Sequence, residues 1–357
     1  MRPFWALCVN EWQKWNKRRR LLILAAVMAL FPAALLAIVL GFWSPAPPRW
    51  QALVQAQIAA NQAELSKLEQ QLPRLPKGMQ PGVAKMITAI QGTNDQLQYQ
   101  LAHNIAPSDW YAAAQATQQL TGSILRLLVL LVAWLGAESI AQERADGTIR
   151  LWLSHPASRS ALLASKFVSL TAAIAAALLL GWLLCFGTAG LLQGHWGGFD
   201  SRVLLWQDLS KATSGATSGL LLPLRQYCLE AMALAFLVCL MAAGGGMLAS
   251  VLTQGPGAAI GLSLGLLVGG QLLWGVLRVL YLNDLLYLPF WAHFLFIAHL
   301  SPVGELGLSS RDTVPPPPPG SLQGYDFAWV PTVSLAGWSA VFVALATLLF
   351  TRRDELG

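Results

Sequence analysis

The hydrophobic positions of this chain are collected into six long apolar runs, separated by polar stretches of very unequal length. A helix that crosses a bilayer needs about 20 predominantly apolar residues, and each run reaches that length. The pattern therefore predicts an all-α integral membrane protein with six transmembrane helices. The runs are Leu21–Trp43, Gly122–Ala141, Leu162–Leu192, Tyr227–Thr253, Pro256–Leu282 and Pro331–Phe350.

A seventh apolar stretch, Leu285–Leu300, is only about 16 residues long and contains Pro289. It suits an outer re-entrant segment, within residues 284–301, better than a crossing. An even number of crossings then agrees with the basic residues near both ends, which the positive-inside rule places in the cytoplasm of a bacterial inner membrane. These residues are Arg2, Lys14, Lys17, Arg18, Arg19 and Arg20 before the first run, and Arg352 and Arg353 after the last.

The segment before the first run has helical periodicity, and residues 1–43 are expected to form an interfacial helix followed by the first span. Phe4, Cys8, Glu11 and Trp15 recur at helical spacing. Together with Trp5 and Trp12, this pattern is typical of an amphipathic helix at the cytoplasmic interface, with its indole rings at headgroup depth. Two roles stay open for this helix, a membrane anchor and a contact with a partner.

Residues 44–118 contain two heptad seams on either side of a Pro/Gly-rich breaker, PRLPKGMQPG, at residues 73–82. Pairing the seams about that breaker places Asn61 opposite Asn94, where an asparagine pair would fix the register of two helices. We expect an extracytoplasmic antiparallel helical hairpin that projects outward from the membrane; two helices lying flat on the membrane or on a partner are the alternative. The seams are Val54, Ile58, Asn61, Leu65, Leu68 and Leu72, then Val83, Ile87, Ile90, Asn94, Leu97 and Leu101.

Residues 119–357 hold the other five spans, and the segment 138–166 between two of them is a polar island in an apolar chain. A short amphipathic stretch there, Ile149–Leu153, is flanked by charged residues. Membrane topology alone does not require such a segment, and its pattern is typical of a helix that docks into a cleft of a soluble partner. A solvated loop that only satisfies the orientation rules is the alternative.

At this island the chain resembles the permeases of type 2 ABC exporters, which have an acidic-basic pair, Gly-Thr, an apolar stretch, Pro-x-Ser-Arg and a Lys that opens the third span. The resemblance implies a dimer of permease subunits and a coupling helix near Gly147–Leu153 that is pressed by separate ATPase subunits carrying ATP and Mg²⁺. No phosphate-binding G-x-x-x-x-G-K-[ST] loop occurs in this chain. The coupling residues are Glu143, Arg144, Asp146, Gly147, Thr148, Arg150, Leu153, Pro156, Ser158, Arg159 and Lys166.

Two further features lie inside the spans. Gly257, Gly261, Gly265 and Gly269 recur every four residues and predict a smooth packing face, against another helix of the same chain in the favoured interpretation, or against a second protomer. Arg126 lies about one turn inside the second span, close enough to the interface that a structural role is the favoured interpretation. Among the charged residues in the spans it is the best candidate for contact with a substrate.

Composition removes several classes of protein. Hydrophobic residues make up 55% and charged residues only 11% of the chain, so a soluble domain is excluded. The net charge of +6 reflects membrane orientation, and nucleic acid is not an expected partner. The histidine and cysteine positions predict neither a metal site nor a catalytic group, so the chain itself is not expected to be an enzyme or to bind a cofactor.

These observations predict the membrane-spanning subunit of an ATP-driven exporter. The alternative is a membrane subunit that transmits force to a periplasmic protein without moving a substrate, which a long outer hairpin would suit. Lipid, the ATPase subunits and a second protomer, identical or different, are the expected partners. An intramembrane enzyme is disfavoured because no paired catalytic residues occur in the spans.

Overall fold

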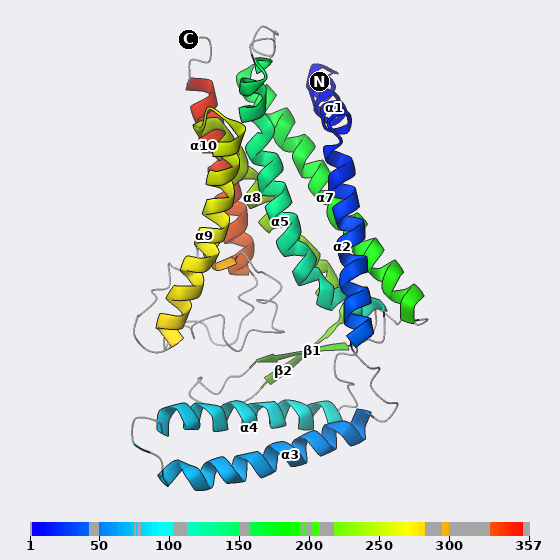
Figure 1. The fold of residues 1–357 in the computed structure, drawn as a ribbon, viewed down its shortest axis with the longest axis vertical. Helices are drawn as coiled ribbons and strands as arrows, with labels where there is room; N and C mark the ends of the chain where they lie inside the picture. Colours follow the sequence, from blue (N-terminus) through cyan, green and yellow to red (C-terminus); the bar gives the residue numbers. More distant parts are fainter. Residues whose placement is uncertain are drawn as a thin grey trace.

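The computed structural model describes residues 2–42, 50–74, 76, 80–102, 113–149, 158–193, 196, 202–207, 218–282, 295–299 and 329–352. These residues form a bundle of long helices with a helical hairpin across one end (Figure 1). The helices are α1 (Arg2–Lys17), α2 (Arg20–Phe42), α3 (Trp50–Gln71), α4 (Gln80–Ala102), α5 (Ala113–Ala145), α7 (Arg159–Gln193), α8 (Leu224–Leu252), α9 (Pro256–Leu282) and α10 (Trp329–Arg352).

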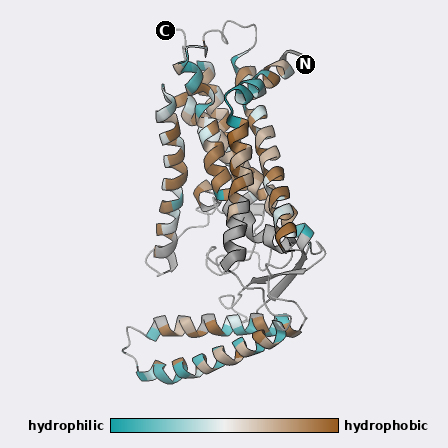
Figure 2. Ribbon diagram, turned by 45° about the vertical axis from the view of Figure 1, so that its right-hand side comes forward, coloured by the Kyte–Doolittle hydropathy of each residue, from teal (hydrophilic) through white to brown (hydrophobic). Residues whose placement is uncertain are grey.

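Within the described part of the chain, five helices are long and apolar enough to cross a membrane. Their apolar stretches are Leu125–Ala145, Arg159–Leu192, Cys228–Leu252, Pro256–Leu277 and Thr332–Arg352. In α2, the stretch Arg20–Phe31 counts only as a shorter apolar helix. The protein is therefore a helical, multi-pass membrane protein, and the sixth span stays a prediction. Figure 2 shows the brown, hydrophobic residues concentrated in the bundle and the teal ones at its ends and in the hairpin.

The core of the bundle forms where α5 and α8 pack together, with α7, α9 and α10 around them. The backbones of α5 and α8 approach closely because Gly136 of α5 faces Gly246 of α8. A Cβ built at Gly246 of α8 would lie 2.5 Å from the carbonyl oxygen of Ala133, and one at Gly136 of α5 would lie 2.8 Å from that of Ala243. Small residues at such a crossing allow the two backbones to come into contact, and interfaces between membrane helices are enriched in them.

The hairpin consists of α3 and α4, which pack side by side and are joined near the 3₁₀ turn η1 (Leu72–Arg74). The Asn61 amide nitrogen donates a hydrogen bond to Asn94 Oδ1 at 2.8 Å, so the two asparagines that the seams place opposite each other share one level. Val54 and Ile87 are buried along the same contact.

The sequence led us to expect a hairpin that extends outward along the axis of the bundle, and the structure differs from this expectation. It lies crosswise over the end of the bundle in both views (Figures 1 and 2). α2 ends at Phe42 and α4 ends at Ala102, whereas α3 begins at Trp50 and α5 at Ala113. No described helix therefore runs from the hairpin into the bundle to align the two axes. On which side of the membrane the hairpin lies stays a prediction.

A short β-ribbon corrects the expectation of a wholly helical chain. Strands β1 (Arg202–Gln207) and β2 (Ser218–Pro223) pair antiparallel, with Arg202 opposite Pro223 and Gln207 opposite Ser218. In Figure 1 the ribbon lies between the bundle and α4. Apolar runs of this length do not reveal their secondary structure by periodicity, which is why the strands were not predicted.

The expected re-entrant segment, residues 284–301, falls mostly outside the described residues. Its described part is a 3₁₀ turn, η4 (Phe296–His299), which packs against α9 and α10. Ile297 fills the space that a side chain at Gly270 would need, because a Cβ there would lie 2.6 Å from Ile297 Cγ2. Phe296 packs edge-on against Trp338 and Phe342 of α10. This part of the segment is thus held firmly against the bundle.

Candidate functional site

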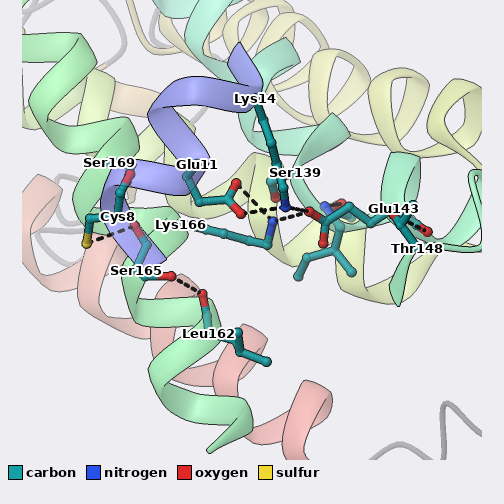
Figure 3. A network of polar contacts seen from close by, with 12 residues as sticks. Cys8, Glu11, Lys14, Ser139, Glu143, Thr148, Leu162, Ser165, Lys166 and Ser169 are labelled. Atoms are coloured by element: carbon teal, nitrogen blue, oxygen red, sulfur yellow. Dashed lines mark hydrogen bonds and ion pairs between the residues drawn. The ribbon is translucent and has the colours of Figure 1, made fainter. Parts of the chain in front are cut away.

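Four charged side chains meet at the end of the bundle where α5 stops, and we call them the Glu–Lys quartet: Glu11 and Lys14 from α1, Glu143 from α5 and Lys166 from α7. Figure 3 shows the four side chains converging from the three helices. Lys14 Nζ lies 2.6 Å from Glu143 Oε1 and 2.9 Å from Glu11 Oε1. Lys166 Nζ lies 2.8 Å from Glu143 Oε1 and 3.1 Å from Glu11 Oε2.

The quartet has no net formal charge, and three of its members are buried. Glu11, Glu143 and Lys166 are only 5%, 7% and 8% exposed. Each lysine binds both carboxylates, so removing any one member would leave an opposite charge poorly compensated in an apolar surrounding. Breaking a buried ion pair in this way typically costs about 3–5 kcal/mol. The quartet therefore holds α1, α5 and α7 together in one arrangement.

Arg144, the next residue along α5, ties that helix to the end of α8. Its guanidinium donates hydrogen bonds to the carbonyl oxygens of Ser250, Val251 and Thr253, at 3.0, 3.2 and 2.7 Å. Carbonyls in the last turn of a helix lack partners within the helix, and a cation there also interacts favourably with the helix dipole. Arg144 thus acts within the chain as a C-cap, and its expected contact with the ATPase subunit stays a prediction.

A turn follows α5, and Gly147 is its central residue. Gly147 has φ +69°, a left-handed conformation that ends helices and that glycine adopts without strain. Its amide donates to the carbonyl of Arg144 at 3.0 Å, while the Thr148 hydroxyl donates to the carbonyl of Glu143 at 3.3 Å. The turn is therefore fixed directly behind the quartet.

Asp146 lies exposed in this turn and connects it to the joint between α1 and α2. Its Oδ2 lies 2.5 Å from Arg18 Nη2, and its Oδ1 accepts a hydrogen bond from the Gln142 amide at 2.8 Å. These hydrogen bonds, with the positive charge of Arg18, hold the pKa of Asp146 below its usual value. Ala145, Asp146 and Gly147 are all exposed, so the tip of the turn is open to a partner.

Ile149, the first apolar residue after the turn, packs into the end of the bundle. It is buried with Ile140, Leu163 and Phe350, which come from α5, α7 and α10. A small pocket beside the quartet is lined by these same four residues together with Glu11, Glu143 and Lys166. The start of the expected coupling segment is thus seated in the bundle. Arg150, Leu153 and Pro156 lie outside the described residues.

Helix α7 begins with a capped end. Ser158 Oγ accepts a hydrogen bond from the amide of Ala161 at 3.2 Å, which is the usual role of an N-cap serine. Arg159 donates to the carbonyl of Thr351 at 3.4 Å, near the end of α10. The Ser-Arg pair thus fixes the start of α7 next to the end of α10.

Comparison with known protein families decides the class of this protein. The family model of the ABC-2 family transporter proteins matches residues 5–355. The chain belongs to the ABC-2 transporter family.

A comparison with curated proteins gave no match. As an ABC-2 protein, the chain is the membrane subunit of an ABC transporter; it partners with ABC ATPase subunits and is not itself the ATPase. Among its described residues, no group of three or more His, Cys, Asp and Glu side chains is placed to hold a metal ion.

The glycines of α9 do not pack as the favoured interpretation expected in this ABC-2 subunit. A Cβ built at Gly257, Gly261, Gly265 or Gly269 meets no described atom within 4 Å. The residues that α9 buries are Ala259, Ser263 and Leu267, two positions further along. Two residues correspond to about 200° around a helix, so the glycines occupy the opposite side of α9. Arg126, the other predicted feature of the spans, is exposed on α5.

Several residues of this ABC-2 site were not singled out by sequence reasoning. Glu11 and Lys14 complete the quartet although they precede Glu143 by more than 120 positions. The sequence did contain one indication of the quartet: Glu11 places a carboxylate in the otherwise apolar stripe of Cys8 and Trp15. A charge on a buried face needs a partner of opposite charge. Ser250 is buried and accepts hydrogen bonds from the amides of Ile140 and Ala141, and no local pattern marked it.

Proposed function

We propose that the chain is the membrane-spanning subunit of an ABC exporter in the bacterial inner membrane, with six spans and with both termini and the α5–α7 connection in the cytoplasm. The exposed turn Ala145–Gly147 takes up the movement of a separate ATPase subunit when it binds and hydrolyses ATP. The observation that carries this proposal is the position of Glu143, which binds α1 and α7 just ahead of the turn.

The contacts around the turn would spread a local push over most of the bundle. The quartet connects the turn to α1 and α7, Arg144 connects it to α8, and Asp146 connects it to the start of α2 through Arg18. Packed interfaces of this kind favour discrete arrangements over gradual bending, so a displacement at the turn is suited to shift helices as units. This supports alternating access as the mode of export.

A second permease protomer completes the proposed assembly. The glycine face of α9 allows close approach of another helix and has no described partner in the chain. Only 11% of the residues in the most apolar stretch of α9 are buried inside the chain, compared with 67% for α8. We place α9 at the interface between two protomers, beside the path of the substrate.

The docking step can be tested by a bulky substitution on the exposed turn. Ala145→Trp places a large ring at the last residue of α5, and Ala102→Trp makes the same change at the exposed last residue of α4, at the opposite end of the molecule. Each variant is co-expressed with the ATPase subunit, and copurification and permease-stimulated ATP hydrolysis are measured. Ala145→Trp should lose most of both, and Ala102→Trp should retain them. Normal docking and stimulation with Ala145→Trp would show that the turn is not the contact.

The hairpin supports a second candidate function, force transmission to a periplasmic protein without export. Its arms are held in register by the Asn61–Asn94 hydrogen bond, and it covers the end of the bundle that is opposite the quartet (Figure 1). Reconstituted vesicles separate the two functions. ATP-dependent movement of a substrate supports export, whereas ATP hydrolysis that depends on a periplasmic partner, with no substrate movement, supports transmission.

A further inference from the structure

Helix α1 has two long faces of different character. Cys8, Glu11 and Trp15 are buried against the bundle, where Cys8 and Ser169 of α7 are linked by a hydrogen bond. On another face of the helix, Trp5, Val9 and Trp12 are 62%, 55% and 39% exposed. A row of large apolar side chains outside the bundle indicates a surface that is covered by another apolar phase.

Basic side chains gather at the end of this helix, where α1 joins α2. Lys17, Arg18 and Arg19 are all exposed, and Arg18 is engaged by Asp146. Within the described part of the chain, Lys17 and Arg19 have no ion-pair partner. Arg19 has φ +56°, a conformation that costs free energy for any residue other than glycine. The joint thus presents two uncompensated cations, one of them at a strained position.

The depth of these residues follows from the first turn of α2. That helix begins at Arg20, and Leu22 and Ile23 are 63% and 42% exposed directly after it. If α2 is a membrane span, as proposed above, these two side chains lie in hydrocarbon, and Lys17 and Arg19 lie less than two turns away. The layer at that depth consists of lipid headgroups, and tryptophan is enriched in the same layer.

We propose that the α1–α2 joint binds the headgroup of an acidic phospholipid. Lys17 and Arg19 contact its phosphate and negative charge, while Trp5, Val9 and Trp12 rest on the boundary between headgroups and acyl chains. The combination of exposed cations with exposed indoles favours a lipid surface over a soluble partner, because each group then lies in the layer that suits it. The Arg18–Asp146 ion pair holds the joint in place for this contact.

Native mass spectrometry of the full-length chain tests the proposal. Purified protein is equilibrated with equal amounts of dioleoylphosphatidylglycerol and dioleoylphosphatidylcholine, and the ratio of the two bound lipids is measured. A basic residue near an acidic membrane contributes about 1 kcal/mol, so Lys17→Gln and Arg19→Gln should each reduce the preference for phosphatidylglycerol about fivefold. Lys67→Gln, an exposed lysine of α3, is the matched control and should leave the ratio unchanged.

Two further arms identify the ligand and separate this proposal from the docking proposal. Trp12→Ala should lower retention of both lipids equally, and inorganic phosphate should not displace phosphatidylglycerol. Copurification of the ATPase subunit is measured on the same variants, so a lost lipid preference with normal docking concerns the lipid site alone. An unchanged lipid ratio in the Lys17→Gln/Arg19→Gln double variant, or displacement of the lipid by phosphate, would overturn the proposal.

Discussion

Helices α8 and α9 follow each other in the chain with three residues between them, and both contain several glycines. They differ in how much of each helix is buried inside the chain. In the most apolar stretch of each helix, 67% of the residues of α8 and 11% of those of α9 are buried inside the chain. Gly246 of α8 lies against the backbone of α5, where a side chain would collide with Ala133. The regularly spaced glycines of α9 meet no described atom within 4 Å.

This difference shows that glycine spacing indicates a smooth face but does not identify its partner. The four-residue repeat of α9 is the stronger sequence signal, and it faces away from the residues that α9 buries. The run Gly244–Gly246 in α8 has no such repeat, yet Gly246 meets the backbone of α5, and Gly244 and Gly245 meet Phe342 of α10. The comparison between the two helices can be tested at single residues.

The largest effect is expected from adding a side chain at the α5–α8 crossing. In Gly246→Val, the new atoms would overlap the backbone of α5 near Ala133 and Ala137 and force the helices apart. We expect a loss of about 3 kcal/mol or more in the free energy of unfolding, measured by thermal unfolding in detergent. Gly261→Val in α9 is the matched control, and the monomeric protein that carries it should unfold like the wild type; equal losses in the two variants would remove the distinction between the helices.

The next largest effect concerns the cap of α8. Arg144→Met keeps much of the side-chain length but removes the hydrogen bonds to three carbonyls in and after the last turn. Hydrogen bonds from a charged donor typically contribute about 1.5–3 kcal/mol, and we expect a loss in this range. Arg126→Met, at an exposed arginine of the same helix α5, serves as control. If both variants were equally stable, the cap would not contribute to the packing of α8.

The serines of the two helices provide a smaller, paired test. Ser250 of α8 accepts hydrogen bonds from two amides of α5, at 2.9 and 2.7 Å. Ser263 of α9 donates one hydrogen bond to the carbonyl of Ala133, at 3.3 Å. Ser250→Ala should cost about 1–2 kcal/mol and Ser263→Ala about 0.5 kcal/mol in thermal unfolding. The reverse order would show that α9 is bound to α5 more firmly than α8 is.

The smallest effect on the chain itself is expected at the glycine face of α9. Gly261→Ala should change the free energy of unfolding by less than about 0.5 kcal/mol, because no described residue contacts this position. Gly261→Leu should instead lower the fraction of dimeric permease, measured by crosslinking in native membranes. Leu262→Ala, at an exposed neighbour, is the control. Normal dimer formation with Gly261→Leu would assign the protomer interface to another surface.

Much of the architecture could be predicted from the sequence, because it depends on local spacing. Apolar length gave the bounds of α7, α8, α9 and α10 to within a few residues. The heptad seams placed Asn61 opposite Asn94, since a seam and a turn between two helices leave little choice of register. The island indicated Glu143 and Lys166, which belong to one polar segment and its adjoining helix.

What the sequence alone determined is therefore the set of helices, their apolar faces and the polar segment that interrupts them. Only the tertiary structure decided which faces meet. Lys14 lies 129 positions from Glu143 and Ser250 lies 110 positions from Ile140, and such pairings depend on the arrangement of all the helices. The same holds for the crosswise hairpin and for the outward-facing glycines of α9. A periodic pattern identifies which face of a helix is suited to a contact, whereas the packing of the whole bundle determines which other helix meets that face.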